Sequence, residues 1–350
     1  MPSPRRAFSD AFPSDCWYAL ARSGGVDAEP LGLRALGLPV VLFRGADGRA
    51  VALEDRCAHR AYPLSSGVVV DEGIRCGLCG FVYDADGQCV SVPTQPRVPF
   101  GARVASYPVQ ERDGLVWVWL GEAGRARLAR VPELPWLDDE SWAGVGGSSL
   151  VAAGYLLLHE NFADVTQVPF VAPDIAPSVI ADAPPLDVVV TETTVTLRRE
   201  FPPARLPAWQ AGLLGAGEAE FTTLQEGYFL SPAVWVDHWD VTGADGATGR
   251  LRFTHLVTPL DEGISQLHWQ VDRDFAVGDD AADDLMLEMF GDYYDRVIVA
   301  METAQEVLDT DGPGPEVNVA ADVAALKVRE IVLDMLATES PVVSTRRARV

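Results

Sequence analysis

The stretch CAHRAYPLSSGVVVDEGIRCGLCGFVYDADG, residues 57–87, contains two pairs of side chains that can bind a metal. The first pair is Cys57 and His59, and after sixteen further residues the second pair is Cys76 and Cys79. Each pair lies in a predicted loop between strands, with glycines nearby that let backbone amides approach sulfur. Two pairs at this spacing are a strong signal, because thiolate and imidazole suit both iron–sulfur clusters and zinc.

Three interpretations of the four side chains stay open at this point. They could hold a 2Fe–2S cluster with three cysteines and one histidine as ligands. Such a cluster carries one more negative charge than a cluster held by two cysteines and two histidines, so its reduction potential should be lower. They could hold zinc, for which three cysteines and one histidine are an ordinary tetrahedral set. They could also form a packed loop without metal, with free thiols or a bridge between Cys76 and Cys79.

Length, charge and cysteine content limit the classes of protein to which the chain can belong. The chain has 350 residues, enough for two domains, and a net charge of −24. That charge argues against nucleic acid and anionic membranes as partners, since both require a basic face. With no apolar run long enough to span a bilayer and no secretory signal, we expect a cytoplasmic protein. Four of the five cysteines cluster within residues 57–89, which favours metal over disulfides there.

The first third of the chain is predicted to be a small all-β domain, residues 15–121, after a tail at 1–14. Short β-rich segments separated by Gly and Asp-Gly turns support this prediction; they are residues 39–44, 50–55, 102–112 and 114–121. Residues 122–150 are expected to be a connector.

The remaining chain, residues 151–340, is predicted to be an α+β domain, followed by a tail at 341–350. One helix is expected at 155–168. The strand-like segments are 186–200, 219–230, 233–242, 250–258 and 264–273, and two further helices are expected at 280–309 and 319–337. An antiparallel sheet closed by a long helix can leave a pocket between the two layers.

Several segments resemble the Rieske non-heme-iron oxygenases, in particular those similar to vanillate O-demethylase. In the first domain these are WYAL, PVVLFRGADGRAVALEDRCAHRAYPLSSG, DEGIRCGLCGFVYDADGQCVSVPTQ and GLVWVWLG. Later in the chain they are HENFADVTQVPFV (159–171) and YYDRVIVAMETAQEVL (293–308). The resemblance implies a Rieske β-domain joined to a helix-grip catalytic domain, usually in a homotrimer.

The resemblance also implies roles for individual residues. Cys57, His59 and Cys76 match ligands of the family's 2Fe–2S cluster, whereas Cys79 stands where the family has a histidine that passes the electron onward. Asp164 matches the aspartate that carries the electron between subunits.

The mononuclear iron of the family is held by two histidines and a carboxylate, and two of these three ligands are missing. The histidine positions hold Gln167 and Ala172, and the carboxylate position matches Asp295. We therefore expect a 2Fe–2S cluster on Cys57, His59, Cys76 and Cys79 at most, and no mononuclear iron.

These departures predict a protein that binds a hydrophobic small molecule and catalyses a redox-neutral step in natural-product biosynthesis. Cyclisation, isomerisation and elimination are the candidate reactions, with Asp164, Gln167 and Asp295 as candidate catalytic residues. One alternative is an oxygenase with non-standard ligands, supplied by Gln167 or by histidines at 159, 238, 255 or 268. Another is a non-catalytic subunit of a mixed trimer. A reductase partner is expected only if the cluster is redox-active.

Overall fold

The computed structural model describes residues 12–176, 178–261, 263–312 and 314–339, and divides into two compact units. Residues 12–133 make up most of one unit, and residues 134–257 and 263–338 make up the other. The expected tails fall largely outside the described residues. Within the first unit, Ser14 is held by the Glu339 carboxylate, which accepts from the Ser14 backbone N–H at 2.6 Å and from its hydroxyl at 3.0 Å.

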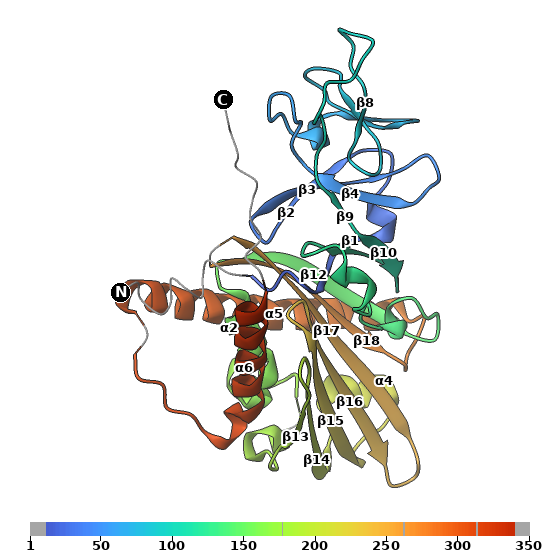
Figure 1. The fold of residues 1–350 in the computed structure, drawn as a ribbon. Helices are drawn as coiled ribbons and strands as arrows, with labels where there is room; N and C mark the ends of the chain where they lie inside the picture. The colour runs from blue at the N-terminus through green and yellow to red at the C-terminus, as the bar shows by residue number, and fades with distance from the viewer. Residues whose placement is uncertain (1–11, 177, 262, 313, 340–350) are drawn as a thin grey trace. The chain divides into compact units, whose positions relative to one another are not determined.

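The N-terminal unit contains only strands and single-turn 3₁₀ helices among its described residues, as predicted (Figure 1). Its three-stranded sheet has the order β1 (Trp17–Arg22), β11 (Leu115–Trp119), β10 (Val109–Arg112). One four-stranded sheet has the order β2 (Leu31–Ala35), β3 (Leu38–Arg44), β4 (Ala50–Glu54), β9 (Ser106–Tyr107). The other has the order β5 (Val68–Val70), β6 (Gly73–Arg75), β7 (Val82–Tyr83), β8 (Cys89–Ser91).

The segment predicted as one strand at 102–112 is divided at Pro108 into β9 and β10, which pair in different sheets. Proline has no N–H to donate to a ladder, so the chain can change sheets there at little cost. The 3₁₀ helices in the described part of the chain are η1 (Ser23–Gly25), η2 (Leu64–Ser66), η3 (Arg125–Arg127), η4 (Pro135–Leu137), η5 (Val165–Gln167), η6 (Ser178–Asp182) and η7 (Ala320–Asp322).

The C-terminal unit is built on a seven-stranded antiparallel sheet (Figure 1). Its order is β12 (Ala143–Val151), β18 (Ile264–Arg273), β17 (Thr248–Asp261), β16 (Val234–Gly243), β15 (Glu220–Ser231), β14 (Val195–Arg205), β13 (Asp187–Val190). The expected connector at 122–150 thus includes most of an edge strand. Glycine and serine dominate this strand, which hides its β pattern in the sequence.

Five α-helices accompany this sheet among the described residues: α2 (Tyr155–Ala163), α3 (Val168–Val171), α4 (Ala208–Leu214), α5 (Asp280–Asp311) and α6 (Val323–Thr338). The long helix α5 packs on the sheet, where Phe290 contacts Phe253 of β17 and Tyr294 stacks on Trp269 of β18. The α+β class is therefore confirmed. No helix in the described part of the chain is both long and apolar enough to cross a membrane.

The prediction of one continuous helix at 155–168 is wrong at Asp164. This residue has an extended backbone, with φ −122° and ψ 108°, and its carboxylate accepts the Thr166 N–H at 2.8 Å. Aspartate competes with helical hydrogen bonding in this way, so it ends α2 and begins η5. The break sets the direction of Gln167, which follows three residues later.

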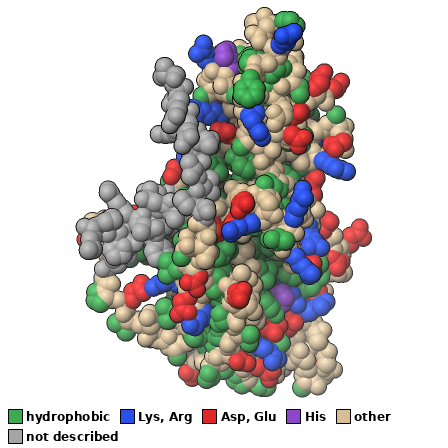
Figure 2. Space-filling view, viewed as in Figure 1, with side chains coloured by type: hydrophobic (Ala, Val, Ile, Leu, Met, Phe, Trp, Pro, Cys, Tyr) green, Lys and Arg blue, Asp and Glu red, His purple; other side chains and the backbone are tan. Residues whose placement is uncertain are grey.

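Charged side chains cover much of the surface. Acidic groups are spread over the face shown in Figure 2, in keeping with the net charge of −24. Side chains with shifted pKa values lie in both units: Cys57 in the N-terminal unit, and Asp237 and His255 in the C-terminal unit.

Candidate functional site

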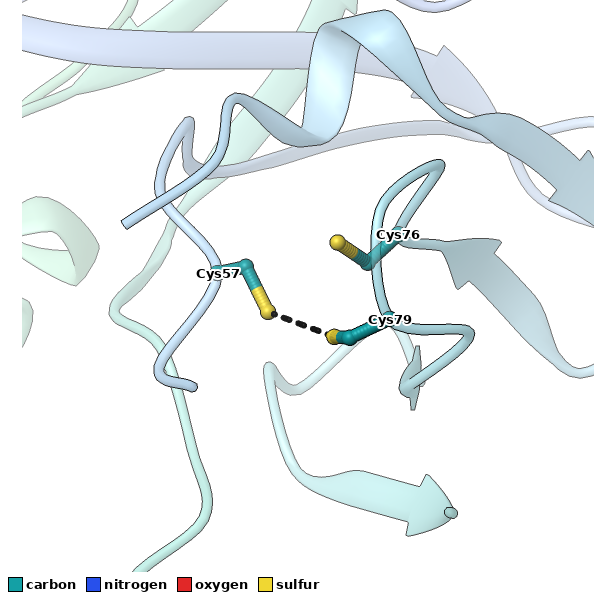
Figure 3. Close-up of side chains that lie close together, drawn as sticks. All are labelled: Cys57, Cys76 and Cys79. Carbon is teal, nitrogen blue, oxygen red and sulfur yellow. Dashed lines mark hydrogen bonds between the residues drawn. The ribbon is translucent and has the colours of Figure 1, made fainter. Parts of the chain in front are cut away.

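Three cysteines converge in the N-terminal unit (Figure 3). The Sγ atoms of Cys57, Cys76 and Cys79 all lie within 4.8 Å of one another, and those of Cys57 and Cys79 are 3.6 Å apart. Cys57 comes from one loop, while Cys76 and Cys79 come from a second loop after β6. A separation of 3.6 Å is far longer than a disulfide bond, so the thiols are free.

Backbone turns aim the thiols of the second loop. The Cys76 N–H donates to the Phe81 carbonyl at 2.8 Å, and the Gly80 N–H donates to the Cys76 carbonyl at 3.0 Å. Gly80 has φ +73°, a left-handed conformation that glycine adopts without strain. A Cβ there would also meet Pro93 at 2.7 Å, so this turn requires glycine.

Tyr83 supports the thiol of Cys57. Its hydroxyl lies 3.2 Å from Cys57 Sγ and accepts the Ala58 N–H at 3.0 Å, which leaves the hydroxyl hydrogen free to point at sulfur. Burial acts to raise the pKa of Cys57, but the hydrogen bonds to Tyr83 and the neighbouring backbone and thiols outweigh burial, and the pKa is lowered. The loop therefore favours a thiolate at Cys57, the form that binds metals.

His59 is placed differently from the three cysteines. Its side chain is exposed and stacks on Phe81, with ring centroids 5.0 Å apart and an angle of 8° between the planes. It is not part of the compact group of thiols. The structure thus brings together three of the four predicted cluster ligands.

A pocket lies between α5, the sheet and the segment from α2 to η6 in the C-terminal unit. It contains about 750 Å³ of space free of protein atoms, a volume that includes the open solvent at its mouth. Most of its wall is apolar or aromatic, including Phe162, Val165, Val168, Ile180, Trp209, Trp239, Val241, Leu251, Phe253 and Phe290. The predicted pocket between helix and sheet is therefore present.

The three positions that correspond to iron ligands are not brought together. Gln167 lines the pocket and donates to the Asn161 side-chain oxygen at 3.3 Å. Ala172 is buried but does not line the pocket, and Asp295 is exposed on α5. We expected Asp295 to face the pocket, but the α5 residue beside Gln167 is Tyr293. A mononuclear iron site of two histidines and a carboxylate does not fit these residues.

Asp164 also lies outside the pocket wall. Its carboxylate caps η5 by accepting the Thr166 N–H and the Thr166 hydroxyl, the latter at 2.7 Å. It lines a separate, polar depression, which also contains the ion pairs that Arg329 makes with Glu160 and Glu316. Its observed contacts are those of a local cap.

Sequence analysis missed Asp237, the one carboxylate among the described residues that line the pocket. It is 4% exposed on β16 and accepts the Trp235 indole N–H at 2.6 Å. Gln225 approaches its other oxygen at 3.5 Å and in turn accepts from Arg199 at 2.6 Å. Burial raises the pKa of Asp237 to about 7, against the opposing effects of Trp235, Gln225 and Arg199. The available signal was an aspartate that directly follows the apolar residues Val234–Val236 of its strand.

A second polar pair faces the pocket from β17 and α5. His255 Nε2 and the Tyr294 hydroxyl are 2.7 Å apart, and the His255 ring stacks on Phe162 with centroids 3.9 Å apart. Burial lowers the pKa of His255 to about 3, so the imidazole is neutral. Burial likewise raises the pKa of Tyr293 and of Tyr294, which keeps both phenols protonated.

The N-terminal β-domain with its loop cysteines and the C-terminal sheet with its long helix define the class of Rieske oxygenase-type proteins. Residues 16–108 match the family model of the Rieske [2Fe-2S] domain. Residues 151–338 match the model of the vanillate O-demethylase oxygenase C-terminal domain. The chain belongs to the Rieske non-heme-iron oxygenase family.

Individual relatives agree with this assignment. The chain is 35% identical to a vanillate O-demethylase oxygenase subunit of Pseudomonas, over 66% of this chain and 62% of that one. It is 29% identical to the iron-sulfur subunit of a toluene-4-sulfonate monooxygenase system of Comamonas testosteroni, over 93% and 97%. The crystal structure of dicamba monooxygenase bound to 3,6-dichlorosalicylic acid has the same fold, with a TM-score of 0.86 and 24% identity over 93% and 98%.

Proposed function

We propose that this protein binds a hydrophobic, conjugated small molecule in the pocket and catalyses a redox-neutral conversion, such as a cyclisation, isomerisation or elimination. The observation that carries the proposal is that the pocket is complete while the iron-ligand positions hold Gln167, a buried Ala172 and an exposed Asp295. A family member built in this way keeps the means to bind a substrate but lacks the ligands that activate oxygen.

The aromatic lining of the pocket supports a flat, unsaturated substrate. Trp209 and Phe253 each pack against Phe290, with ring centroids 5.6 and 5.5 Å apart, and all three line the pocket. Aromatic walls bind flat conjugated groups through dispersion and ring stacking. Holding a flexible chain in one reactive conformer lowers the barrier by several kcal/mol without any redox chemistry.

The polar groups of the pocket support a substrate with a carbonyl. Protonated Asp237 and the phenol of Tyr293 can each donate a hydrogen bond, and the Asn161 amide nitrogen has no partner within the described residues. A donor aimed at a carbonyl draws electron density from the conjugated system and stabilises developing negative charge on oxygen. With a pKa of about 7, Asp237 can also give and take a proton near neutral pH.

Asp237 and Gln167 thus take the catalytic roles in this proposal, in place of Asp164 and Asp295. The expected homotrimer and the place in natural-product biosynthesis stay predictions. An oxygenase with substitute ligands is a weaker proposal: His255 is the one histidine that lines the described pocket, and it is engaged with Tyr294.

The proposal is tested by incubating the purified full chain anaerobically, without reductant, with linear polyenes that carry a conjugated ketone. The expected product has the same mass as its substrate after cyclisation or isomerisation, or is lighter by the released group after elimination. Asp237→Asn slows its formation about 100-fold or more, as for loss of a general acid. Asp295→Asn is the matched control and keeps the full rate. Conversion that requires oxygen and reductant, with a mass gain of one oxygen, contradicts the proposal.

A further inference from the structure

The loop cysteines are placed for a different metal site from the one the family domain holds. In a Rieske cluster, two ligands bind one iron and two bind the other. Ligands on opposite irons are separated by the iron–iron distance as well as by their own bonds, which puts them more than about 5 Å apart. In this chain, all three Sγ atoms lie within 4.8 Å of one another. Cys57 and Cys79, which the family pattern assigns to different irons, are 3.6 Å apart.

These separations between sulfur atoms suit three ligands of a single metal ion. Zinc binds thiolate sulfur at about 2.3 Å in a tetrahedron, so two sulfurs on the same zinc are roughly 3.8 Å apart. The separation of 3.6 Å between Cys57 and Cys79 agrees with that edge. Figure 3 shows the side chains of Cys57 and Cys79 approaching each other from two loops, with Cys76 on the same loop as Cys79.

The surroundings provide what a structural zinc site needs. Cys57 and Cys76 are 1% and 2% exposed, and the cysteines pack against a cluster that includes Leu64 and Ile74. The Tyr83 hydroxyl lies beside Cys57 Sγ, as outer-shell donors do around zinc thiolates. The turn at Gly80 places Cys76 and Cys79 on one side of their loop.

We propose that Cys57, Cys76 and Cys79 together bind a single zinc ion that stabilises the loops of the N-terminal unit, instead of a 2Fe–2S cluster. A structural zinc takes four protein ligands, and an imidazole suits the fourth position; His59 is two residues from Cys57. The site is independent of the function proposed for the pocket, so either proposal can fail alone.

Metal content is the first test. The full chain is stripped of metal under reducing conditions and offered zinc, then cobalt as a spectroscopic substitute, each in slight excess. We expect one ion per chain, and the cobalt form should show the intense sulfur-to-cobalt charge-transfer and tetrahedral visible bands of a three-thiolate site. Fewer than about 0.2 ions per chain, or a cobalt spectrum without thiolate bands, overturns the proposal.

Cysteine variants assign the ligands. Cys79→Ser should weaken zinc binding more than about 100-fold, beyond what loss of an outer-shell partner costs. Cys89→Ser is the matched control, because Cys89 is buried in the same core cluster but is outside the group of three thiols. If Cys79→Ser binds zinc as tightly as Cys89→Ser does, the assignment is wrong. A zinc-dependent rise in melting temperature in wild type, absent in Cys79→Ser, is the second readout.

Reconstitution with iron and sulfide distinguishes the proposed zinc site from a 2Fe–2S cluster. Wild type and Cys79→His, which restores the family pattern of two cysteines and two histidines, are reconstituted side by side with ferrous iron and sulfide. We expect two irons and two acid-labile sulfides per chain in Cys79→His and none retained in wild type after desalting. A wild-type chain that keeps two irons and two sulfides overturns the proposal, whatever the variant does.

Discussion

The indole N–H of Trp235 donates to Asp237 Oδ2 at 2.6 Å, two residues along the same buried strand. This hydrogen bond is strongest when Asp237 is ionised, because bonds to charged acceptors are roughly twice as strong as neutral ones. It therefore links the packing of the sheet to the protonation of the one carboxylate that lines the described pocket.

Trp235→Phe should destabilise the protein by about 1–3 kcal/mol, and by more at pH 8 than at pH 5.5. The cost is larger at pH 8 because the variant leaves an ionised carboxylate without its strongest donor. Urea unfolding at both pH values measures it. Trp136→Phe is the control: its indole donates to the neutral Thr254 hydroxyl at 3.0 Å, so its cost should not change with pH. Equal pH dependence in the two variants contradicts the role given to Trp235.

Asp237 itself should make the protein less stable as the pH rises from about 4 to about 7. The pKa of Asp237 is about 7 when folded and near its ordinary value when unfolded, so the folded chain binds the extra proton in this window. The unfolding free energy contributed by this group is complete below the window and lost across it, by at most about 4 kcal/mol. Asp237→Asn should remove this slope. Urea unfolding across the pH range compares the two chains, and identical profiles would falsify the shifted pKa.

Three buried or half-buried histidines make the protein less stable as the pH falls, which is opposite to the effect of Asp237. Burial lowers the pKa of His159 to about 4, and of His238 and His255 to about 3. The unfolded chain takes up these protons below about pH 6.5 while the folded chain does not, so stability is lost as the pH falls toward 4. His159→Gln should reduce the proton uptake on unfolding by about one at pH 5. Calorimetry in buffers of different ionisation enthalpy measures that uptake, and an unchanged value rules His159 out.

Filling the pocket should abolish binding without unfolding the chain. Val241→Trp adds a large ring at a wall position that is 2% exposed, and overpacking of this kind costs about 1–3 kcal/mol. Binding of a conjugated polyene ketone, followed by quenching of tryptophan fluorescence, should fall at least about tenfold. The control is Val189→Trp, at a 61% exposed position of β13, which should bind normally. Equal binding by both variants places the ligand elsewhere.

The fold was predictable from the sequence because its strands and long helices carry strong periodic patterns. Exceptions occurred where one residue overrode the pattern, as when Asp164 capped η5 and ended α2 early. The glycine- and serine-rich strand β12 gave no periodic signal and appeared to be a connector.

The site was predictable only in part. The spacing of Cys57, Cys76 and Cys79 in the sequence predicted a group of metal ligands, and the three Sγ atoms do lie close together. The direction of Asp295 was not predictable, because a helix position two residues away from Tyr293 faces solvent instead of the pocket. Asp237 was missed because its neighbours Gln225 and Arg199 come from other strands, and only pairing in the sheet brings them together.

The two altered histidine positions, Gln167 and Ala172, are five residues apart, at the end of η5 and immediately after α3. The segment from Val165 to Ala172 also supplies three residues of the pocket wall, while half of the wall residues come from the sheet and α5. The segment that carries the altered ligand positions therefore also shapes the binding pocket. A few substitutions in this one segment can change the positions of the family's iron ligands and the wall of the binding pocket together.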